Sequence, residues 1–220
     1  MSGALEFLSK HYQMGGFSMH PIAIVMIFAV VIGLERAYAL FVKLYVDGVG
    51  FMATVQKLIA SGKTSQAIKV CDYHRRTALG RVVRAGLSVA DQGEEAIQNA
   101  VDEATLDVLP EIQKRTAYLQ MIANVATLLG LLGTIVGIIG AFAGLANLDP
   151  VSRQESLSKG ISEALNATAF GLCVAIPAMI LHSILMARTM KMVDELDRFS
   201  VKLINLLTRT GGSGRRAMQE

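Results

Sequence analysis

The sequence predicts an all-α integral membrane protein with three transmembrane helices. Three apolar blocks, at 17–42, 116–148 and 164–187, carry this prediction, and the last two contain no Asp, Glu, Lys or Arg. Roughly 20 apolar residues are enough to cross a bilayer core. Outside the blocks, apolar residues recur every three or four positions, which is typical of amphipathic helices. With 52% hydrophobic residues, the chain is too apolar for an ordinary soluble domain.

The first block follows an outer N-terminal segment, 1–16. Its apolar core runs to Leu34 and is followed by Glu35 and Arg36, with further apolar residues up to Val42. No basic stretch precedes the block, and no small-residue cleavage site follows it. We therefore expect an uncleaved membrane span over 17–42 rather than a signal peptide.

The second block, 116–148, contains glycines on one helical stripe and polar residues on a neighbouring stripe. The glycines should allow close helix packing, and the polar groups offer sites for water or ions. At about 1.5 Å per residue the block would form a helix on the order of 50 Å, longer than the bilayer core of about 30 Å. We expect it to project into the cytoplasm, with 91–115 as its soluble continuation and Pro110 marking a kink or break. The stripes consist of Gly130, Gly133, Gly137, Gly140 and Gly144, and of Gln120, Asn124, Thr127 and Thr134.

The third block, 164–187, is expected to follow an outer loop at 149–163. Pro177 should bend this span because proline removes a backbone donor. Apolar residues at spacings of three and four continue beyond the span and predict a cytoplasmic helix over 188–210. The last residues, 211–220, contain Gly, Ser and Arg, and we expect a disordered tail.

The distribution of Lys and Arg predicts the orientation. The segment before the first span has one such residue, and the 149–163 loop has two. Eleven lie in 36–115, and seven lie after the third span. Because cytoplasmic segments carry the excess of Lys and Arg, the N-terminus should lie outside and the C-terminus in the cytoplasm.

The inner region, 43–115, predicts short helices and no catalytic centre. Phosphate-binding, nucleophilic and metal-ligand motifs are not found in it, so an enzyme is disfavoured. The net charge of +3 comes without a strong basic run, which argues against nucleic-acid binding. Cys71 and Cys173 are expected to stay apart as free thiols, and no cofactor is predicted. The helix faces comprise Phe51, Val55, Leu58 and Ile59, then Ala67, Ile68 and Cys71, then Leu79, Val82, Val83 and Leu87.

Two sequence blocks resemble a known family. LLGLLGTIVGIIGAF (128–142) and GISEALNATAFGLCVAIPA (160–178) are similar to the paired signatures of the MotA/TolQ/ExbB proton-channel family. Shorter similarities cover 34–36, 58–71 and 81–87. Three spans with one large inner region resemble the TolQ/ExbB branch, since the MotA branch has four spans.

The resemblance implies a ring, typically a pentamer, in the bacterial inner membrane. In each chain, two of the three transmembrane helices would extend far into the cytoplasm. The ring would surround the membrane helices of a TolR- or ExbD-like partner that supplies an aspartate for proton transfer. Proton motive force would then drive work on the cell envelope or outer membrane transport, with a further envelope-spanning protein as a possible partner. The chain itself has no acidic residue at mid-span, which independently suggests a second subunit.

The resemblance implies that Thr134 and Thr168 lie on the inner wall of the ring. Thr127 lies on the same helical face as Thr134. The alternative is that these hydroxyls bond backbone carbonyls of their own or a neighbouring helix. Glu163 and Asn166 are candidates for an ion pathway or a subunit interface, and Glu163 could instead pair with a nearby Lys or Arg. His182, near the inner end of span three, is either a pathway residue or a structural histidine. A non-conducting membrane scaffold and a sodium-coupled motor remain the competing functions, and the sequence does not decide which envelope system is driven.

Overall fold

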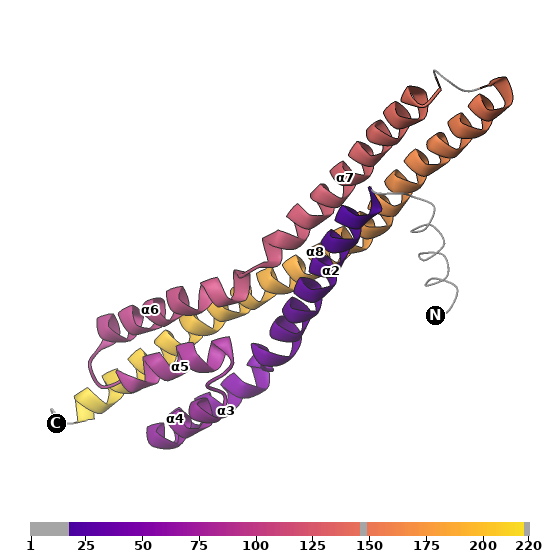
Figure 1. The fold of residues 1–220 in the computed structure, drawn as a ribbon. Helices are drawn as coiled ribbons and strands as arrows, with labels where there is room; N and C mark the ends of the chain where they lie inside the picture. The colour runs from indigo at the N-terminus through magenta and orange to yellow at the C-terminus, as the bar shows by residue number, and fades with distance from the viewer. Residues whose placement is uncertain (1–17, 146–148, 218–220) are drawn as a thin grey trace. The chain divides into compact units, whose positions relative to one another are not determined.

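The computed structural model describes residues 18–145 and 149–217, and within these ranges the secondary structure is helical. The chain divides into two compact units (Figure 1). Unit 1 comprises residues up to Glu35 together with Arg115–Ile184, and unit 2 comprises Arg36–Lys114 together with the residues from Leu185 onward. The helices are α2 (Met19–Tyr38), followed by a π-helical turn (Ala39–Lys43), α3 (Gly48–Ala60), α4 (Thr64–Tyr73), α5 (Ala78–Ser88), α6 (Glu94–Gln113), α7 (Thr116–Ala143) and α8 (Pro150–Ala217).

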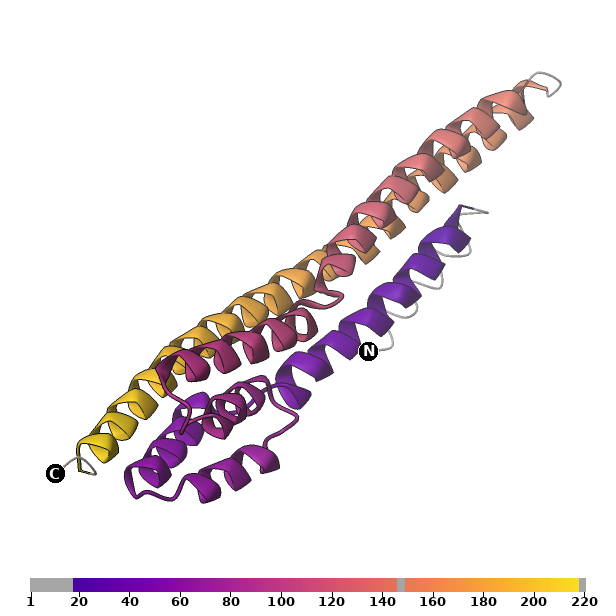
Figure 2. The same cartoon turned by 90° about the vertical axis from the view of Figure 1, so that its left-hand side faces the viewer.

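Unit 1 is a bundle of α2, α7 and the first part of α8. Figures 1 and 2 show α7 and α8 running side by side in both views. The core is built from small and medium-sized residues, so the helices approach closely. It contains Met19, Ile22 and Ala29 of α2, Ile122, Ala123 and Ala126 of α7, and Phe170, Val174, Ala175 and Ala178 of α8.

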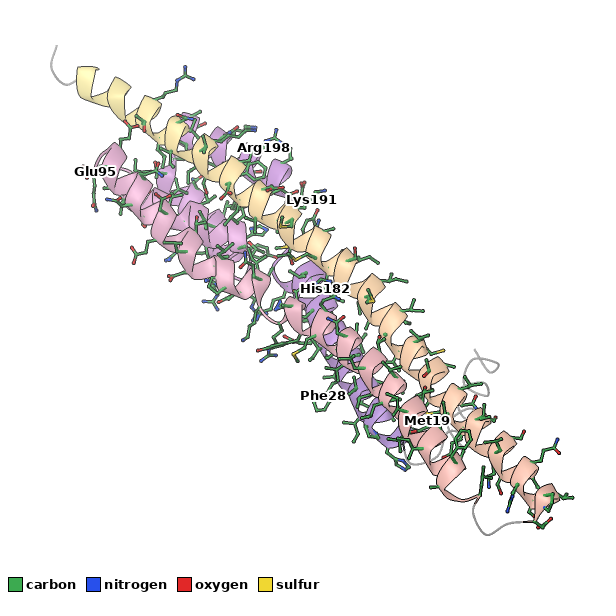
Figure 3. All side chains as sticks on the ribbon, turned by 90° about the horizontal axis from the view of Figure 1, so that it is seen from above. Met19, Phe28, Glu95, His182, Lys191 and Arg198 are labelled. Carbon is green, nitrogen blue, oxygen red and sulfur yellow. The ribbon has the colours of Figure 1, made fainter. Side chains whose placement is uncertain are left out.

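The outer surface of unit 1 is apolar, as expected for a protein surrounded by lipid. Phe28 points outward from α2 with 57% of its surface exposed (Figure 3). Ile135 and Ile139 of α7 are exposed in the same way, and so is Ile180 of α8. Three helices in the described residues are long and apolar enough to cross a membrane. The predicted all-α membrane architecture with three spans is therefore confirmed.

Unit 2 is a helical domain made by α3 to α6 and the later part of α8. The predicted short inner helices are present, with side-chain caps at two of their N-termini. Asp47 accepts a hydrogen bond from the backbone N–H of Val49 at the start of α3, and Thr77 accepts one from Gly80 at the start of α5. One fully buried residue from each helix marks the core: Val55, Ala67, Val82, Val101 and Leu203.

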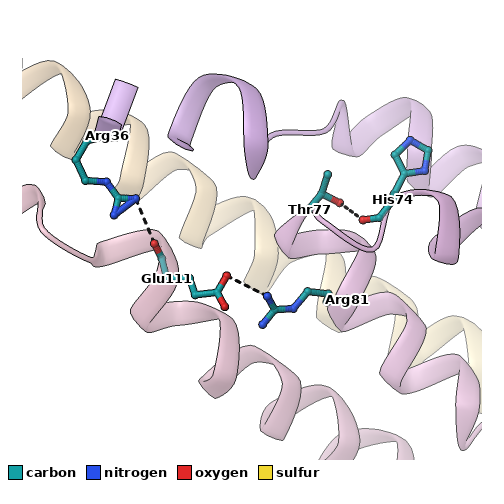
Figure 4. Close-up of polar contacts among 5 residues, drawn as sticks. All are labelled: Arg36, His74, Thr77, Arg81 and Glu111. Atoms are coloured by element: carbon teal, nitrogen blue, oxygen red, sulfur yellow. Dashed lines mark hydrogen bonds and ion pairs between the residues drawn. The ribbon is translucent and has the colours of Figure 1, made fainter. Parts of the chain in front are cut away.

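Arg36 is the largest fully buried side chain of unit 2, at 2% exposure. Its guanidinium donates hydrogen bonds to the backbone carbonyls of Glu111, in the last turn of α6, and of Lys114, the residue that caps the C-terminus of this helix. Figure 4 shows Arg36 reaching the Glu111 backbone, while the Glu111 carboxylate pairs with Arg81 at 3.0 Å. A cation at a helix C-terminus satisfies carbonyls that have no partner within the helix.

The helix break between α6 and α7 lies at Lys114 and Arg115, not at Pro110. Pro110 is accommodated inside α6. Arg115 adopts a left-handed conformation with φ of 60°, and its side chain pairs with Glu35 at 3.0 Å. The continuation predicted for 91–115 is therefore a separate helix, and two residues lie between its end and the start of α7.

Three predicted boundaries differ from the structure. The predicted outer loop, 149–163, is helical from Pro150, because Asp149 caps the helix and proline fits its first position. Helix α8 also continues through 211–217, where we expected a disordered tail. Helix α7 ends at Ala143, so its 28 residues are shorter than the charge-free run. The outer N-terminal segment and residues 146–148 and 218–220 lie outside the described residues.

Candidate functional site

The centre of unit 1 is a close contact between α7 and α8, made possible by glycine. A Cβ added at Gly171 would lie 2.7 Å from the Ala126 carbonyl oxygen and 3.0 Å from the Gly130 Cα. At Gly130 it would lie 3.2 Å from the Ala167 carbonyl oxygen and from the Thr168 Cα. Only glycine lets the two backbones approach this closely.

The five glycines of the α7 stripe do not share one environment. Gly130, Gly133 and Gly137 lie against α8, where added Cβ atoms would meet Ala167 or Ala164 at 2.7 to 3.2 Å. A Cβ at Gly140 would meet nothing within 4 Å. At Gly144 the nearest atom is the carbonyl oxygen of Gly140, at 3.7 Å. The stripe thus has an inner part in contact with α8 and an outer part that leaves open space.

Thr134 of α7 and Thr168 of α8 meet at this contact. Their hydroxyls are hydrogen-bonded to each other. The Thr168 hydroxyl donates to the Gly130 carbonyl at 3.0 Å, and the Thr134 hydroxyl lies 3.2 Å from the carbonyls of both Gly130 and Ala164. Two hydroxyls and two carbonyl oxygens therefore converge between two membrane helices. Both side chains are half-buried, so the cluster is not sealed inside the chain.

The other polar residues of α7 make local contacts. Thr127 is exposed, and its hydroxyl donates to the Ala123 carbonyl at 3.1 Å, one turn earlier. The Gln120 amide donates to the Asn124 side chain at 3.2 Å. The alternative to a pathway role is a hydroxyl bond to a backbone carbonyl of the same or a neighbouring helix, and the structure shows such bonds for Thr127, Thr134 and Thr168.

Glu163 lines a groove of about 580 Å³ between α2, α7 and α8. Lys159 and Ser156 line the same groove one and two turns earlier on α8, opposite Gly140 and Gly144. In the described part of the chain, neither Glu163 nor Lys159 forms an ion pair. Asn166 is half-buried on α8, three residues beyond Glu163. The role of Glu163 and Asn166 in an ion pathway or a subunit interface stays a prediction.

His182 is half-buried on α8, on which it is labelled in Figure 3. Pro177 lies inside α8, whose helical conformation continues on both sides of it. The predicted bend there stays a prediction. Among residues 18–145 and 149–217, no group of three or more His, Cys, Asp or Glu side chains could hold a metal ion.

Two features of the site escaped the sequence analysis. The small residues of α8 that face α7 form a second stripe of Gly160, Ala164, Ala167 and Gly171. Their spacing of four, three and four was a readable signal, because small residues at such spacing mark close helix contacts in membranes. The groove beside Lys159 was missed because a loop is predicted at 149–163, where the structure has a helical wall; Asp149 followed by Pro150 was the signal that could have indicated this helix.

Residues 74–198 match the model of the MotA/TolQ/ExbB proton channel family. The chain is 25% identical to a putative biopolymer transport protein ExbB homolog of Methanothermobacter thermautotrophicus, over 91% of this chain and 68% of that protein. It is 27% identical to a putative biopolymer transport protein ExbB-like 1 of Synechocystis, over 85% and 74%. It is 33% identical to the Tol-Pal system protein TolQ of Haemophilus influenzae, over 46% and 44%.

The match to the family model includes both the α7 and α8 walls of the threonine cluster, and the relatives carry the names of the branch that the two sequence blocks resemble. The chain is a multi-pass membrane protein that belongs to the MotA/TolQ/ExbB proton channel family, in its TolQ/ExbB branch.

Proposed function

We propose that the chain is the ring-forming subunit of an inner-membrane motor driven by proton motive force. Several copies, a pentamer by family resemblance, would surround the membrane helices of a TolR- or ExbD-like partner. The N-terminus would lie outside and the C-terminus in the cytoplasm, as the Lys and Arg distribution indicates. Proton flow would drive work on the cell envelope or transport at the outer membrane.

The observation that carries this proposal is the threonine cluster in a membrane wall without an acid. Thr134 and Thr168 bring two hydroxyls together at the closest contact of α7 and α8. The sequence has no Asp or Glu in 116–148 or 164–187, so these spans contain no carboxylate that could carry a proton. Ionisable groups within membranes are usually functional, and here such a group would have to come from the partner.

The test is proton flux through the full chain with its partner, reconstituted in vesicles under an imposed membrane potential. Thr134→Val and Thr168→Val keep the side-chain shape and remove the hydroxyl. We expect each to lower flux about tenfold, as for the loss of one hydrogen bond worth about 1–1.5 kcal/mol. Assembly with the partner should be unchanged.

The matched control is Thr105→Val. The Thr105 hydroxyl donates to the Val101 carbonyl at 2.8 Å within α6, so this variant loses the same kind of bond outside the predicted spans. Wild-type flux in both Thr134→Val and Thr168→Val would refute the role of the cluster. If a protonophore leaves the cellular activity unchanged, the non-conducting scaffold is the better description.

A sodium-coupled motor is the second candidate, because four oxygen atoms converge at the cluster and such oxygens can coordinate a cation in a membrane. Exchanging external Na⁺ for K⁺ at constant proton gradient separates the two couplings. Flux that follows Na⁺ would support the sodium version, and flux that follows pH alone would support proton coupling.

A further inference from the structure

The groove beside Glu163 is amphipathic along its length. At one end its walls are Leu129, Leu132 and Val136 of α7 with Pro21 of α2. At the other end they are Gly140 and Gly144 of α7 facing polar residues of α8, namely Ser156, Lys159 and Glu163. A ligand that fits this groove has an apolar part and a polar part at opposite ends.

The size of the groove suits one leaflet of a bilayer. From Leu129 to Gly144, α7 rises about 22 Å, close to half of a whole bilayer of roughly 40–45 Å. Spread over that length, 580 Å³ corresponds to a mean cross-section of about 26 Å². This is wide enough for an extended hydrocarbon chain. It is too narrow to enclose another helix, whose diameter is about 10 Å.

The charges at the polar end favour a zwitterionic headgroup. Lys159 is exposed and Glu163 is half-buried, one turn apart on α8. Within the described residues neither side chain has an ionic partner, although both line the groove. An ammonium beside a carboxylate complements a ligand that carries a phosphate beside an ammonium. An anionic headgroup would satisfy Lys159 and leave Glu163 repelled.

We propose that this groove binds a glycerophospholipid with a phosphoethanolamine headgroup. The phosphate contacts Lys159, the ammonium contacts Glu163, and an acyl chain lies along α7 toward Leu129. The open space at Gly140 holds the glycerol region. This site requires membrane insertion of unit 1, and it does not depend on the proton pathway at the threonine cluster.

The experiment is native mass spectrometry of the full-length protein, purified in mild detergent and incubated with vesicles of phosphatidylethanolamine, phosphatidylglycerol or phosphatidylcholine. The wild type should retain phosphatidylethanolamine about threefold or more over phosphatidylglycerol, the preference expected from one partly exposed charge pair. Gly140→Leu fills the groove and should lose the retained lipid. Ala143→Leu adds the same side chain to α7 at a position that does not line the groove, and it should retain lipid as the wild type does.

Glu163→Gln tests the headgroup separately from the fold. It should bring phosphatidylethanolamine and phosphatidylglycerol to equal retention, while Lys159→Gln should weaken retention of all three phosphate-bearing lipids. The proposal is overturned if the wild type retains no lipid, or if Gly140→Leu retains as much as Ala143→Leu. It is also overturned if Glu163→Gln keeps the wild-type preference. Efficient disulfide cross-linking of Gly140→Cys between two chains in native membranes would replace the lipid with a second copy of the protein.

Discussion

Gly171→Ala should push α7 and α8 apart and destabilise unit 1. The new Cβ would lie 2.7 Å from the Ala126 carbonyl oxygen, about 0.7 Å inside the 3.4 Å at which ordinary contact begins. The obstructing atoms belong to the backbone, so they cannot rotate away. Overpacking of this kind costs about 1–3 kcal/mol. The higher helix propensity of alanine returns about 1 kcal/mol, which leaves a net loss of about 0–2 kcal/mol.

Gly140→Ala is the matched control, because the same methyl group meets nothing within 4 Å there. Gly140→Ala gains the higher helix propensity of alanine without a steric clash. The two variants should therefore differ in unfolding free energy by about 1–3 kcal/mol, the cost of the overpacking at Gly171. Thermal unfolding of the full chain in detergent or nanodiscs measures this difference. Gly171→Ala should also reduce proton flux, since it separates the helices that carry Thr134 and Thr168. Equal stability of the two alanine variants would refute the claim that backbone contact at Gly171 sets the helix spacing.

Two further predictions concern unit 2. Arg36→Leu removes the donor for the carbonyls of Glu111 and Lys114 and should lower the unfolding free energy by about 2 kcal/mol. In the same denaturant unfolding experiment, the exposed Arg75→Leu should change it by less than about 0.5 kcal/mol, and equal losses would contradict the capping role of Arg36. Burial raises the pKa of the Cys71 thiol to about 11. In a Cys173→Ala background, alkylation of Cys71 should therefore be slow at pH 8, and its rate should rise steeply above pH 9. Rapid alkylation at pH 8 would contradict the burial of this thiol. Because the unfolded thiol loses its proton near pH 9 and the folded one only near 11, stability should be independent of this group below pH 9 and fall between those values.

The helices with strong periodic patterns could be predicted from the sequence. Val82, Val83 and Leu87 lie on one face of the helix expected there, and all three are buried. The error at 149–163 had a physical origin. The segment is polar and lies between two spans, which favours a loop, although Asp149 followed by Pro150 is a helix-start signal. The capping hydrogen bond from the Ser152 backbone to Asp149 shows that the signal was correct.

The pairing at the site could be predicted only in part. Helical periodicity assigns Thr134 to one face of α7 and Thr168 to one face of α8, but it does not say which faces meet. Contacts of Gly130 and Gly171 determine that register, since these are the positions at which the two backbones can approach. The burial of Arg36 likewise could not be predicted from the local sequence pattern, because its hydrogen-bond acceptors lie 75 and 78 residues away in the sequence.

The hydrogen bonds of the threonine cluster limit what it can offer a partner. Each hydroxyl has one proton and two lone pairs. Carbonyls of Gly130 and Ala164, together with the bond between the two hydroxyls, provide enough acceptors to engage both protons within the cluster. Only lone pairs of the hydroxyl oxygens then remain free for a partner, so the cluster accepts hydrogen bonds from it and does not donate them. In the proposed motor it would therefore favour the protonated carboxyl of a partner aspartate over the carboxylate. Such a cluster would stabilise the neutral aspartic acid while the partner's side chain lies beside it. The membrane potential would then act on the charged aspartate once it has moved away from the cluster.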